Sequence, residues 1–274
     1  MTSVDQVIVG GGPNVARHRR SPAVRFLGLV TVLAALTLTG CAGGGSGGYS
    51  TTQSAASVPA GVRSQLAAVG LGSGGDASTI VRARGPRLDV YSSELQSTPS
   101  SVLSNPNEAG APRVLLVVTQ LPGWYQVLLP VQPNGSKGWV KAADVIASKT
   151  SYRVKVARGA HTITVYNGKT VALSAPVAIG TGDTPTPGGQ YYITELLQPA
   201  NPAGPYGPYA FGISGFSTTL ASFDGYAPVI GIHGTNQPAL IGHDVSHGCI
   251  RLSNANIRKL ASFLPLGTPV TISA

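Results

Sequence analysis

Residues 232–252 read IHGTNQPALIGHDVSHGCIRL and contain three of the five histidines and one of the two cysteines of this 274-residue chain. Cys249 ends the run Ser-His-Gly-Cys, and a second His-Gly pair begins at His233. The thiolate is the reactive form of cysteine, and its formation near neutral pH requires a base or a positive neighbour. The glycine after each histidine permits a sharp turn or the close approach of a substrate. The stretch therefore predicts a cysteine nucleophile served by an imidazole.

The same stretch resembles the catalytic signature of the L,D-transpeptidases, the YkuD-type cysteine enzymes of peptidoglycan. The resemblance rests on His-Gly-Thr-Asn, then Ile-Gly, then Ser-His-Gly-Cys-Ile-Arg-Leu, because order, glycines and spacing agree together. Twelve residues separate His233 from Ser246, as in the shorter branch of the family. The resemblance implies an enzyme without a cofactor that acts on peptidoglycan tetrapeptide stems and is acylated by carbapenem β-lactams.

The resemblance also implies catalytic roles. Cys249 is expected to be the nucleophile and His233 the general base, with its ring held by a backbone carbonyl near Gly234. His247 is the second candidate for the base and is expected to line the acyl-donor site.

Two further catalytic roles fall on the residues just before the nucleophile. Ser246 is expected to hold one of the histidines by a hydrogen bond. The N–H groups of Gly248 and Cys249 are expected to bind the oxyanion of a tetrahedral intermediate.

Substrate contacts are expected on both sides of the nucleophile. Arg251 suits a forked contact with a substrate carboxylate, and the alternative is a structural ion pair with Asp244 or Asp224. The other expected substrate-binding residues are Gly234, Thr235 and Asn236.

The implied reaction is acyl transfer in two steps. Cys249 attacks the carbonyl on the L-centre of the third, diamino acid residue of a tetrapeptide stem, and the terminal D-alanine leaves. A side-chain amine of a second stem then takes the acyl group, which gives a 3→3 cross-link. Transfer prevails over hydrolysis only if the pocket keeps water out.

Three alternatives remain open. The residues His233, His243, His247 and Cys249 have side chains that bind zinc, although the glycines and the β pattern around them disfavour a helical ligand spacing and no metal is expected. A cell-wall cysteine peptidase or amidase uses a similar pair, but enzymes of the NlpC/P60 type place the cysteine before the histidine. The third alternative is a non-catalytic peptidoglycan-binding lipoprotein.

The N-terminus has the pattern of an export signal. A basic segment at 17–25 precedes a largely apolar run of thirteen residues at 26–38, which suits a signal-peptide core and is too short to span a bilayer. The run ends in Leu-Thr-Gly-Cys, which resembles a bacterial lipobox. Residues 1–41 are therefore expected to be a signal peptide ending at a lipidated Cys41, which would anchor the protein outside the cytoplasm, on the cell membrane and facing the cell wall. The alternative is an ordinary secretory leader with an unmodified cysteine.

Export also bears on the remaining cysteine. If Cys41 carries a lipid, Cys249 has no partner in its own chain, whereas exported proteins usually pair their cysteines. A single retained thiol is then explained more readily by catalysis than by packing.

Composition limits the fold and the partners. The chain has 36 glycines and 21 prolines but only 11% charged residues, which favours turns and short strands and predicts an all-β dominated fold. The formal net charge is +9. We expect no nucleic-acid partner, because no basic helix or aromatic–basic motif appears and the leader directs export.

The pattern along the chain predicts a linker and two folded domains. Residues 42–77 have the Gly/Ser/Thr-rich composition of a flexible linker. Residues 78–148 resemble a bacterial SH3-like barrel, in which Trp124 and Trp139 either bind the wall or fill the core of a spacer. Residues 150–274 are expected to form a β-sandwich catalytic domain.

Several elements are expected within that second domain. Ser253 is a helix cap, followed by apolar residues on one face, and 267–272 is a closing strand. The proline-rich stretch 180–188 is expected to form a rigid rim beside the site, and 201–217 is either a lid or a plain connection. His161 is expected to be a structural residue within a strand.

Overall fold

The computed structural model describes residues 77–223 and 225–274. The predicted signal peptide with Cys41 and the linker up to residue 76 lie outside the described residues. Within the described ranges, no helix is both long and apolar enough to cross a membrane.

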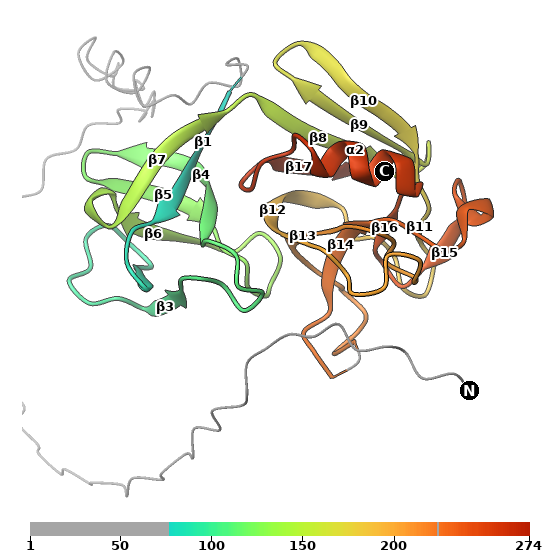
Figure 1. The fold of residues 1–274 in the computed structure, drawn as a ribbon. Coiled ribbons are helices and arrows are strands. Elements are labelled where there is room, and N and C mark those ends of the chain that lie inside the picture. Colours follow the sequence, from blue (N-terminus) through green and yellow to red (C-terminus); the bar gives the residue numbers. More distant parts are fainter. Residues whose placement is uncertain (1–76, 224) are drawn as a thin grey trace, which may run out of the picture.

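The first unit is built on a five-stranded antiparallel sheet with the strand order β6-β5-β4-β1-β7 (Figure 1). Its strands are β1 (Ser78–Ala83), β4 (Val114–Leu121), β5 (Trp124–Leu128), β6 (Lys137–Lys141) and β7 (Val145–Thr150), with the 3-10 turn η1 (Ala142–Asp144) before β7. The long connection after residue 96 contains β3 (Ser101–Ser104), which pairs with β2 (Arg87–Val90) as an antiparallel ribbon.

The two tryptophans of this unit have different environments. Trp139 is buried, with 9% of its surface exposed, and it pairs with Tyr91 through an isolated bridge. Trp124 is half-buried and meets the Tyr91 ring edge-on at 5.1 Å. The Lys141 ammonium lies 5.1 Å from the Tyr91 ring centre, within the range of a cation–π contact. Trp139 thus fills the core, while Trp124 belongs to a partly exposed aromatic cluster.

The second unit is one eight-stranded sheet with the strand order β10-β9-β8-β17-β12-β13-β14-β16, which curls around its own core. Its strands are β8 (Tyr152–Ala157), β9 (Thr162–Asn167), β10 (Thr170–Pro176), β12 (Gly189–Leu197), β13 (Ala210–Phe216), β14 (Val229–His233), β16 (Ile250–Arg251) and β17 (Pro269–Ser273). The short strands β11 (Ile179–Gly180) and β15 (Asp244–Ser246) pair separately in parallel, and η2 (Pro238–Leu240) is a 3-10 turn.

One α-helix, α2 (Asn254–Ala261), follows directly on the strands that carry the central motif (Figure 1). The Ser253 hydroxyl accepts the Asn256 N–H at 3.2 Å and caps the helix, as predicted. Ile257 and Leu260 are fully buried in the core of the curled sheet. The prediction of a mostly-β fold with one short helix after the nucleophile is confirmed.

Strand β12 takes part in both cores. Tyr191 and Ile193 belong to the core of the second unit, whereas Tyr192 belongs to the core of the first. Successive side chains of a strand point to opposite faces, so β12 is covered on both faces here. The strand register shifts between Ile193 and Glu195, an irregularity of the kind that redirects a side chain.

Polar contacts also join the two units. The Asn134 side chain donates to the Phe216 carbonyl and accepts the Phe216 N–H, each at 2.8 Å. Asn107 Nδ2 donates to Glu195 Oε2 at 2.8 Å. Because these bonds end on β12 and β13, the first unit is packed against the strands that form the centre of the second sheet.

The structure differs from the predicted position of His161. This residue precedes β9 in a turn with φ of +47°, rather than lying within the strand. Its Nε2 lies 2.7 Å from Asp244 Oδ1, so the side chain ties this turn to β15.

Candidate active site

Two rows of residues cross the strands β12, β13, β14 and β16 on the outer face of the sheet. In the first row Glu195 lies opposite Gly212, and Gly212 lies opposite Gly231. The pairing of β14 with β16 continues this row to Cys249, whose Sγ accepts the Gly231 N–H at 3.4 Å. The row therefore runs from a carboxylate to a thiol across two glycines.

The second row lies beside the first. Leu197 pairs with Ala210, Ala210 pairs with His233, and His233 pairs with Arg251. Because side chains two positions apart on a strand share a face, His233 and Gly231 point to the same side of the sheet. The sheet thus brings His233, Cys249 and Arg251 together on one surface.

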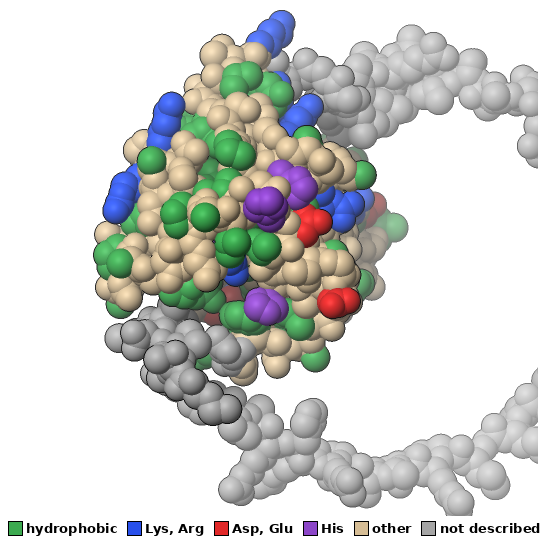
Figure 2. Space-filling model, turned by 90° about the vertical axis from the view of Figure 1, so that its right-hand side faces the viewer, with side chains coloured by type: hydrophobic (Ala, Val, Ile, Leu, Met, Phe, Trp, Pro, Cys, Tyr) green, Lys and Arg blue, Asp and Glu red, His purple; other side chains and the backbone are tan. Residues whose placement is uncertain are grey.

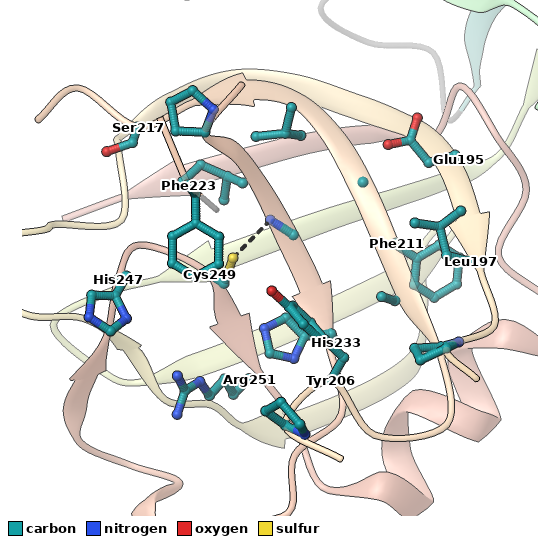
Figure 3. A pocket seen from close by; sticks show the side chains of 18 of the residues that line it. Glu195, Leu197, Tyr206, Phe211, Ser217, Phe223, His233, His247, Cys249 and Arg251 are labelled. Carbon is teal, nitrogen blue, oxygen red and sulfur yellow. Dashed lines mark hydrogen bonds between the residues drawn. The ribbon is translucent and has the colours of Figure 1, made fainter. Parts of the chain in front are cut away.

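Both rows line a pocket of about 450 Å³ (Figure 3). Tyr206 and Phe223 flank it, with Cys249 and His233 between them and Glu195 at the far end. The full lining is Glu195, Leu197, Pro199, Pro205, Tyr206, Ala210, Phe211, Gly212, Ser217, Leu220, Phe223, Pro228, Val229, Ile230, Gly231, His233, His247, Cys249 and Arg251. Part of segment 201–217, including Pro205 and Tyr206, borders the pocket, and the choice between a lid and a plain connection stays a prediction.

The hydrogen bond of His233 determines its tautomer. His233 is only 4% exposed, and its Nδ1 lies 2.6 Å from the Gly234 carbonyl. A carbonyl oxygen only accepts, so Nδ1 carries the proton and Nε2 is left as the basic nitrogen. The Tyr206 ring packs against the imidazole with a centroid distance of 5.0 Å. The structure therefore shows the predicted ring-holding carbonyl, which is that of Gly234 itself.

Cys249 and His233 are both close to Gly231. A Cβ placed on Gly231 would lie 3.8 Å from Cys249 Sγ and 3.7 Å from His233 Cδ2. The sulfur and the imidazole thus lie on either side of a backbone that has no side chain. The absence of a side chain at Gly231 leaves space for a substrate next to the Cys249 sulfur and the His233 ring.

The Ser246 side chain stabilises the turn before the nucleophile and does not bond to a histidine. The Ser246 hydroxyl donates to the Cys249 carbonyl at 2.6 Å and accepts the Gly248 N–H at 3.1 Å. The prediction that Ser246 holds a histidine is therefore wrong, because its hydroxyl closes the tight turn in which Gly248 has φ of +114°. The Gly248 N–H is also engaged, so it would have to share or leave this bond to serve as an oxyanion donor.

The loop predicted as a rigid rim packs directly against this turn. Thr186, which is 1% exposed, donates from Oγ1 to the Gly248 carbonyl at 2.8 Å and accepts the Gly180 N–H at 2.9 Å. Thr184 Oγ1 donates to the Ser246 carbonyl at 3.1 Å. A Cβ on Gly180 would collide with the loop backbone at Thr184 and Thr186. The loop therefore fixes the carbonyls on both sides of His247.

Comparison with known proteins assigns this chain to a protein family. The L,D-transpeptidase catalytic domain family, YkuD, matches residues 151–272. A protein of Bacillus licheniformis provisionally named L,D-transpeptidase YkuD is 35% identical over 155 residues, which cover 54% of this chain and 86% of that protein. The chain belongs to the YkuD family of L,D-transpeptidases.

Two other proteins are similar to parts of this chain. The protein of Bacillus subtilis with the same provisional name is 40% identical over 122 residues, which are 44% of this chain and 66% of that protein, just under two thirds of its length. A solved L,D-transpeptidase 3 from Mycobacterium tuberculosis, in complex with a faropenem-derived adduct, is 19% identical with a TM-score of 0.36. That match covers 53% of this chain and 76% of the other.

Burial keeps both reactive groups of this L,D-transpeptidase domain neutral. It lowers the pKa of His233 from 6.5 to about 4; the bond to Gly234 opposes the shift, and the nearby Arg251 charge adds to it. Burial also raises the pKa of the Cys249 thiol, against smaller opposing effects of the Gly231 N–H and Arg251. At neutral pH the resting site therefore holds a thiol and a neutral imidazole rather than an ion pair.

The expected substrate-binding residues divide into two groups. Arg251 lines the pocket, and its buried Nε has no hydrogen-bond partner within the described part of the chain. It does not pair with Asp244, which contacts His161 instead, and Asp224 lies outside the described residues.

Residues 234–236 do not line the pocket. Thr235 is 3% exposed, its N–H is bound by Asn254 Oδ1 at 2.9 Å, and its hydroxyl accepts the Gln237 N–H. Thr235 thus helps to anchor the end of β14, and the assignment of Gly234, Thr235 and Asn236 to substrate binding stays a prediction.

The other two histidines of the motif lie at the surface. His247 is exposed at the pocket rim, where its ring lies 6.0 Å from that of Phe223. His243 is exposed outside the pocket lining. Figure 2 shows histidine side chains at the surface of this end of the molecule, beside an acidic group. Among the described residues there is no group of three or more His, Cys, Asp or Glu side chains that could hold a metal ion.

Sequence reasoning missed Glu195, Gly231 and Phe223 as parts of the site. Glu195 is far from the motif in sequence, and only strand register brings its carboxylate to the pocket. Phe223 lies in the segment shortly before the motif, and no pattern there indicates that its ring borders the pocket. Gly231 directly precedes the motif, and its importance depends on which strand faces it.

We expect Gly231→Ala to slow the acylation of Cys249 by about 10- to 100-fold while the protein stays folded. The added methyl would lie 3.3 Å from the Phe211 carbonyl and on the floor between the thiol and the imidazole, where displacements of about 1 Å are costly. Mass spectrometry of the acyl-enzyme over time would measure the rate. Gly159→Ala is the matched control, since its methyl would meet only a backbone atom at 3.8 Å. Equal rates in both variants would contradict the prediction.

Proposed function

We propose that this protein is a peptidoglycan L,D-transpeptidase that forms 3→3 cross-links through an acyl-enzyme on Cys249. The main support is that Cys249 and His233 both lie beside Gly231 and both line the same pocket. The His233 ring bonds to the Gly234 carbonyl through Nδ1, which leaves Nε2 as the basic nitrogen. Family membership supports the reaction class.

The first step forms a thioester and releases D-alanine. As the Cys249 sulfur attacks the carbonyl carbon of the donor, its proton passes to His233 Nε2, and the carbonyl oxygen becomes an oxyanion. The intermediate collapses when the bond to the D-alanine nitrogen breaks and His233 returns the proton to that nitrogen. The imidazole is thus neutral before and after the step, which agrees with its low pKa.

Arg251 is proposed to bind the carboxylate of the departing D-alanine. Its guanidinium borders the pocket next to the nucleophile, and its buried Nε donor has no partner in the described structure. A buried donor without an acceptor costs about 1–3 kcal/mol, and a carboxylate ligand would remove this penalty.

The second step transfers the acyl group to an amine of another stem. The amine attacks the thioester carbon and loses a proton to His233 Nε2. The carbon–sulfur bond then breaks, and the leaving Cys249 sulfur takes that proton back from His233. Leu197, Leu220, Phe223 and Val229 supply an apolar lining that disfavours water as the competing acceptor.

The deciding experiment is incubation of the protein with a tetrapeptide stem. The intact mass should first rise by the mass of the stem less D-alanine, and the added group should map to Cys249. Free D-alanine and a cross-linked dimer should then accumulate. A shortened peptide without dimer would instead indicate a cysteine peptidase, and no adduct with either a stem or a carbapenem would reject the enzyme assignment.

The location belongs to the same proposal and rests on the leader sequence alone. We propose that Cys41 carries the lipid that holds the protein on the membrane, outside the cytoplasm and facing the wall, and that the first unit is an SH3-like module. Cys41→Ala should move most of the protein from the membrane fraction to the soluble exported fraction. Unchanged membrane association of this variant, measured by fractionation and immunoblotting, would reject the anchor.

A further inference from the structure

We propose that Glu195 is a specificity-determining residue that binds the side-chain ammonium group of the donor diamino acid. This inference rests on the proposed function, because it concerns the stem that acylates Cys249. It identifies one end of the pocket as a cation subsite.

The register of the sheet aims Glu195 into the pocket. The shift between Ile193 and Glu195 places the carboxylate on the face of Gly212 instead of in the core that holds Ile193. A Cβ on Gly212 would collide with Glu195 Oε1, so this oxygen lies over the bare Gly212 backbone. The carboxylate therefore leans along the first row towards Gly231 and Cys249.

The row sets the distance between the carboxylate and the sulfur. Directly opposite residues of antiparallel strands have Cβ positions roughly 5 Å apart, and this separation applies to Gly212 and Gly231. The Cβ position of Gly231 is a further 3.8 Å from Cys249 Sγ. Glu195 Oε1 and the sulfur are thus separated by roughly 10 Å.

A diamino acid of seven carbons spans this gap. Its backbone carbonyl carbon and its distal nitrogen are about 7–8 Å apart when the side chain is extended, at ~1.5 Å per carbon–carbon bond. With one thioester bond and one hydrogen bond of about 2.8 Å, the extended reach is about 12 Å, so a slightly bent side chain fits the gap. The two glycines leave the floor flat enough for such a side chain to lie across it.

The charge of Glu195 has no cationic partner in the described structure. Asn107 donates to Oε2 at 2.8 Å, but no Lys, Arg or His side chain forms an ion pair with the carboxylate. Arg113, whose charge opposes the burial-driven rise in the pKa of Glu195, is bound to Glu108 at 3.0 Å. Burial raises the pKa of Glu195, against the effects of Thr194, Asn107 and Arg113. An ammonium ligand would offset this loss of hydration.

The geometry favours the donor over the acceptor as the source of the ammonium. The acceptor amine must come within about 3–3.5 Å of the thioester carbon to react. A group bound to Glu195 is too far from the sulfur to do so. The ammonium bound there therefore belongs to the acyl group already attached to Cys249.

The test compares two donor stems, one with a free side-chain amine and one with that amine acetylated. Release of D-alanine in a single turnover reports the donor step alone. We expect the wild-type protein to be acylated about 10- to 100-fold more efficiently by the free-amine stem, the range for a charge-assisted hydrogen bond. Glu195→Gln should be acylated by both stems at the same low efficiency.

Two controls distinguish a loss of ammonium recognition by Glu195 from general damage to the active site. Glu94→Gln removes a carboxylate that lies outside the pocket and forms no ion pair among the described residues, and it should keep the wild-type discrimination. Alkylation of Cys249 by iodoacetamide should be equally fast in wild type and Glu195→Gln if the nucleophile is intact.

The outcomes are distinguishable. Discrimination that persists in Glu195→Gln, or an equal loss with both stems, would overturn the role of Glu195. Equal acylation of the wild-type protein by both stems would also overturn it while leaving the transpeptidase proposal intact. Failure of the wild-type protein to be acylated by either stem would reject the proposed function itself.

Discussion

Replacement of Cys249 by Ala is expected to abolish D-alanine release and cross-linking, with a loss of at least about 10⁴-fold. No other cysteine lies in the described part of the chain, and His233 without the sulfur has nothing to deprotonate. The variant should also form no covalent adduct with a carbapenem. Chromatographic product analysis and intact mass measurement would quantify both losses.

The fold should survive this change. Cys249 Sγ accepts one weak hydrogen bond, from Gly231 at 3.4 Å, so its removal should lower the free energy of unfolding by only about 1 kcal/mol. Thermal unfolding followed by circular dichroism would check this. Cys249→Ser provides a second variant of nearly the same shape with a weaker nucleophile, and it should retain at most trace activity. Dimer formation by the Ala variant at a few per cent of the wild-type rate would rule out the thioester mechanism.

Replacement of His233 by Gln is expected to lower the rate of Cys249 acylation by about 10²- to 10⁴-fold, the usual contribution of a general base. The thiol pKa is raised by burial, so without a proton acceptor little thiolate forms near neutral pH. Binding of the stem should be largely retained, and the loss should therefore appear in kcat rather than KM. His233→Asn is the matched variant, because its amide can still donate to the Gly234 carbonyl while offering no base. Comparable acylation by either variant and wild type would contradict the role of His233.

The same residue should make the wild-type protein sensitive to acid. The His233 pKa is about 4 in the folded protein and 6.5 in an unperturbed histidine, so between these values only the unfolded chain binds the proton. Stability should therefore fall as the pH is lowered through this window, by up to about 1.4 kcal/mol per pH unit from this group. His233→Gln should lose this part of the pH dependence. Denaturant unfolding at pH 7 and pH 4.5 would show whether the two proteins differ as expected.

Local sequence signals predicted the elements that local forces build. The Ser253 cap and the apolar spacing at Ile257 and Leu260 predicted α2, because capping and amphipathic periodicity act within one or two turns. The predicted carbonyl that holds His233 belongs to the next residue in the chain. The nucleophile motif was recognisable for the same reason, since its residues are contiguous.

Sequence reasoning was less successful where long-range register decides the contact. Ser246 was expected to hold a histidine, but its hydroxyl bonds within its own turn. The bond from the Thr235 N–H to Asn254 on the following helix is another contact that the motif itself does not indicate. Glu195 reaches the pocket only through a register shift, and no pattern in its own segment indicates that.

Strand β12 is packed on one face by the second unit and on the other by the first, so the first unit helps to set the shape of the pocket. A strand whose neighbouring side chains Tyr191 and Tyr192 fill different cores cannot slide by one residue without emptying both. Packing on both faces of β12 therefore stabilises the register shift that turns Glu195 towards the pocket. A hydrogen bond from Asn107 also holds the Glu195 carboxylate in place. The first unit therefore supports the strand that carries one end of the pocket, so changes in its core should alter the pocket as well.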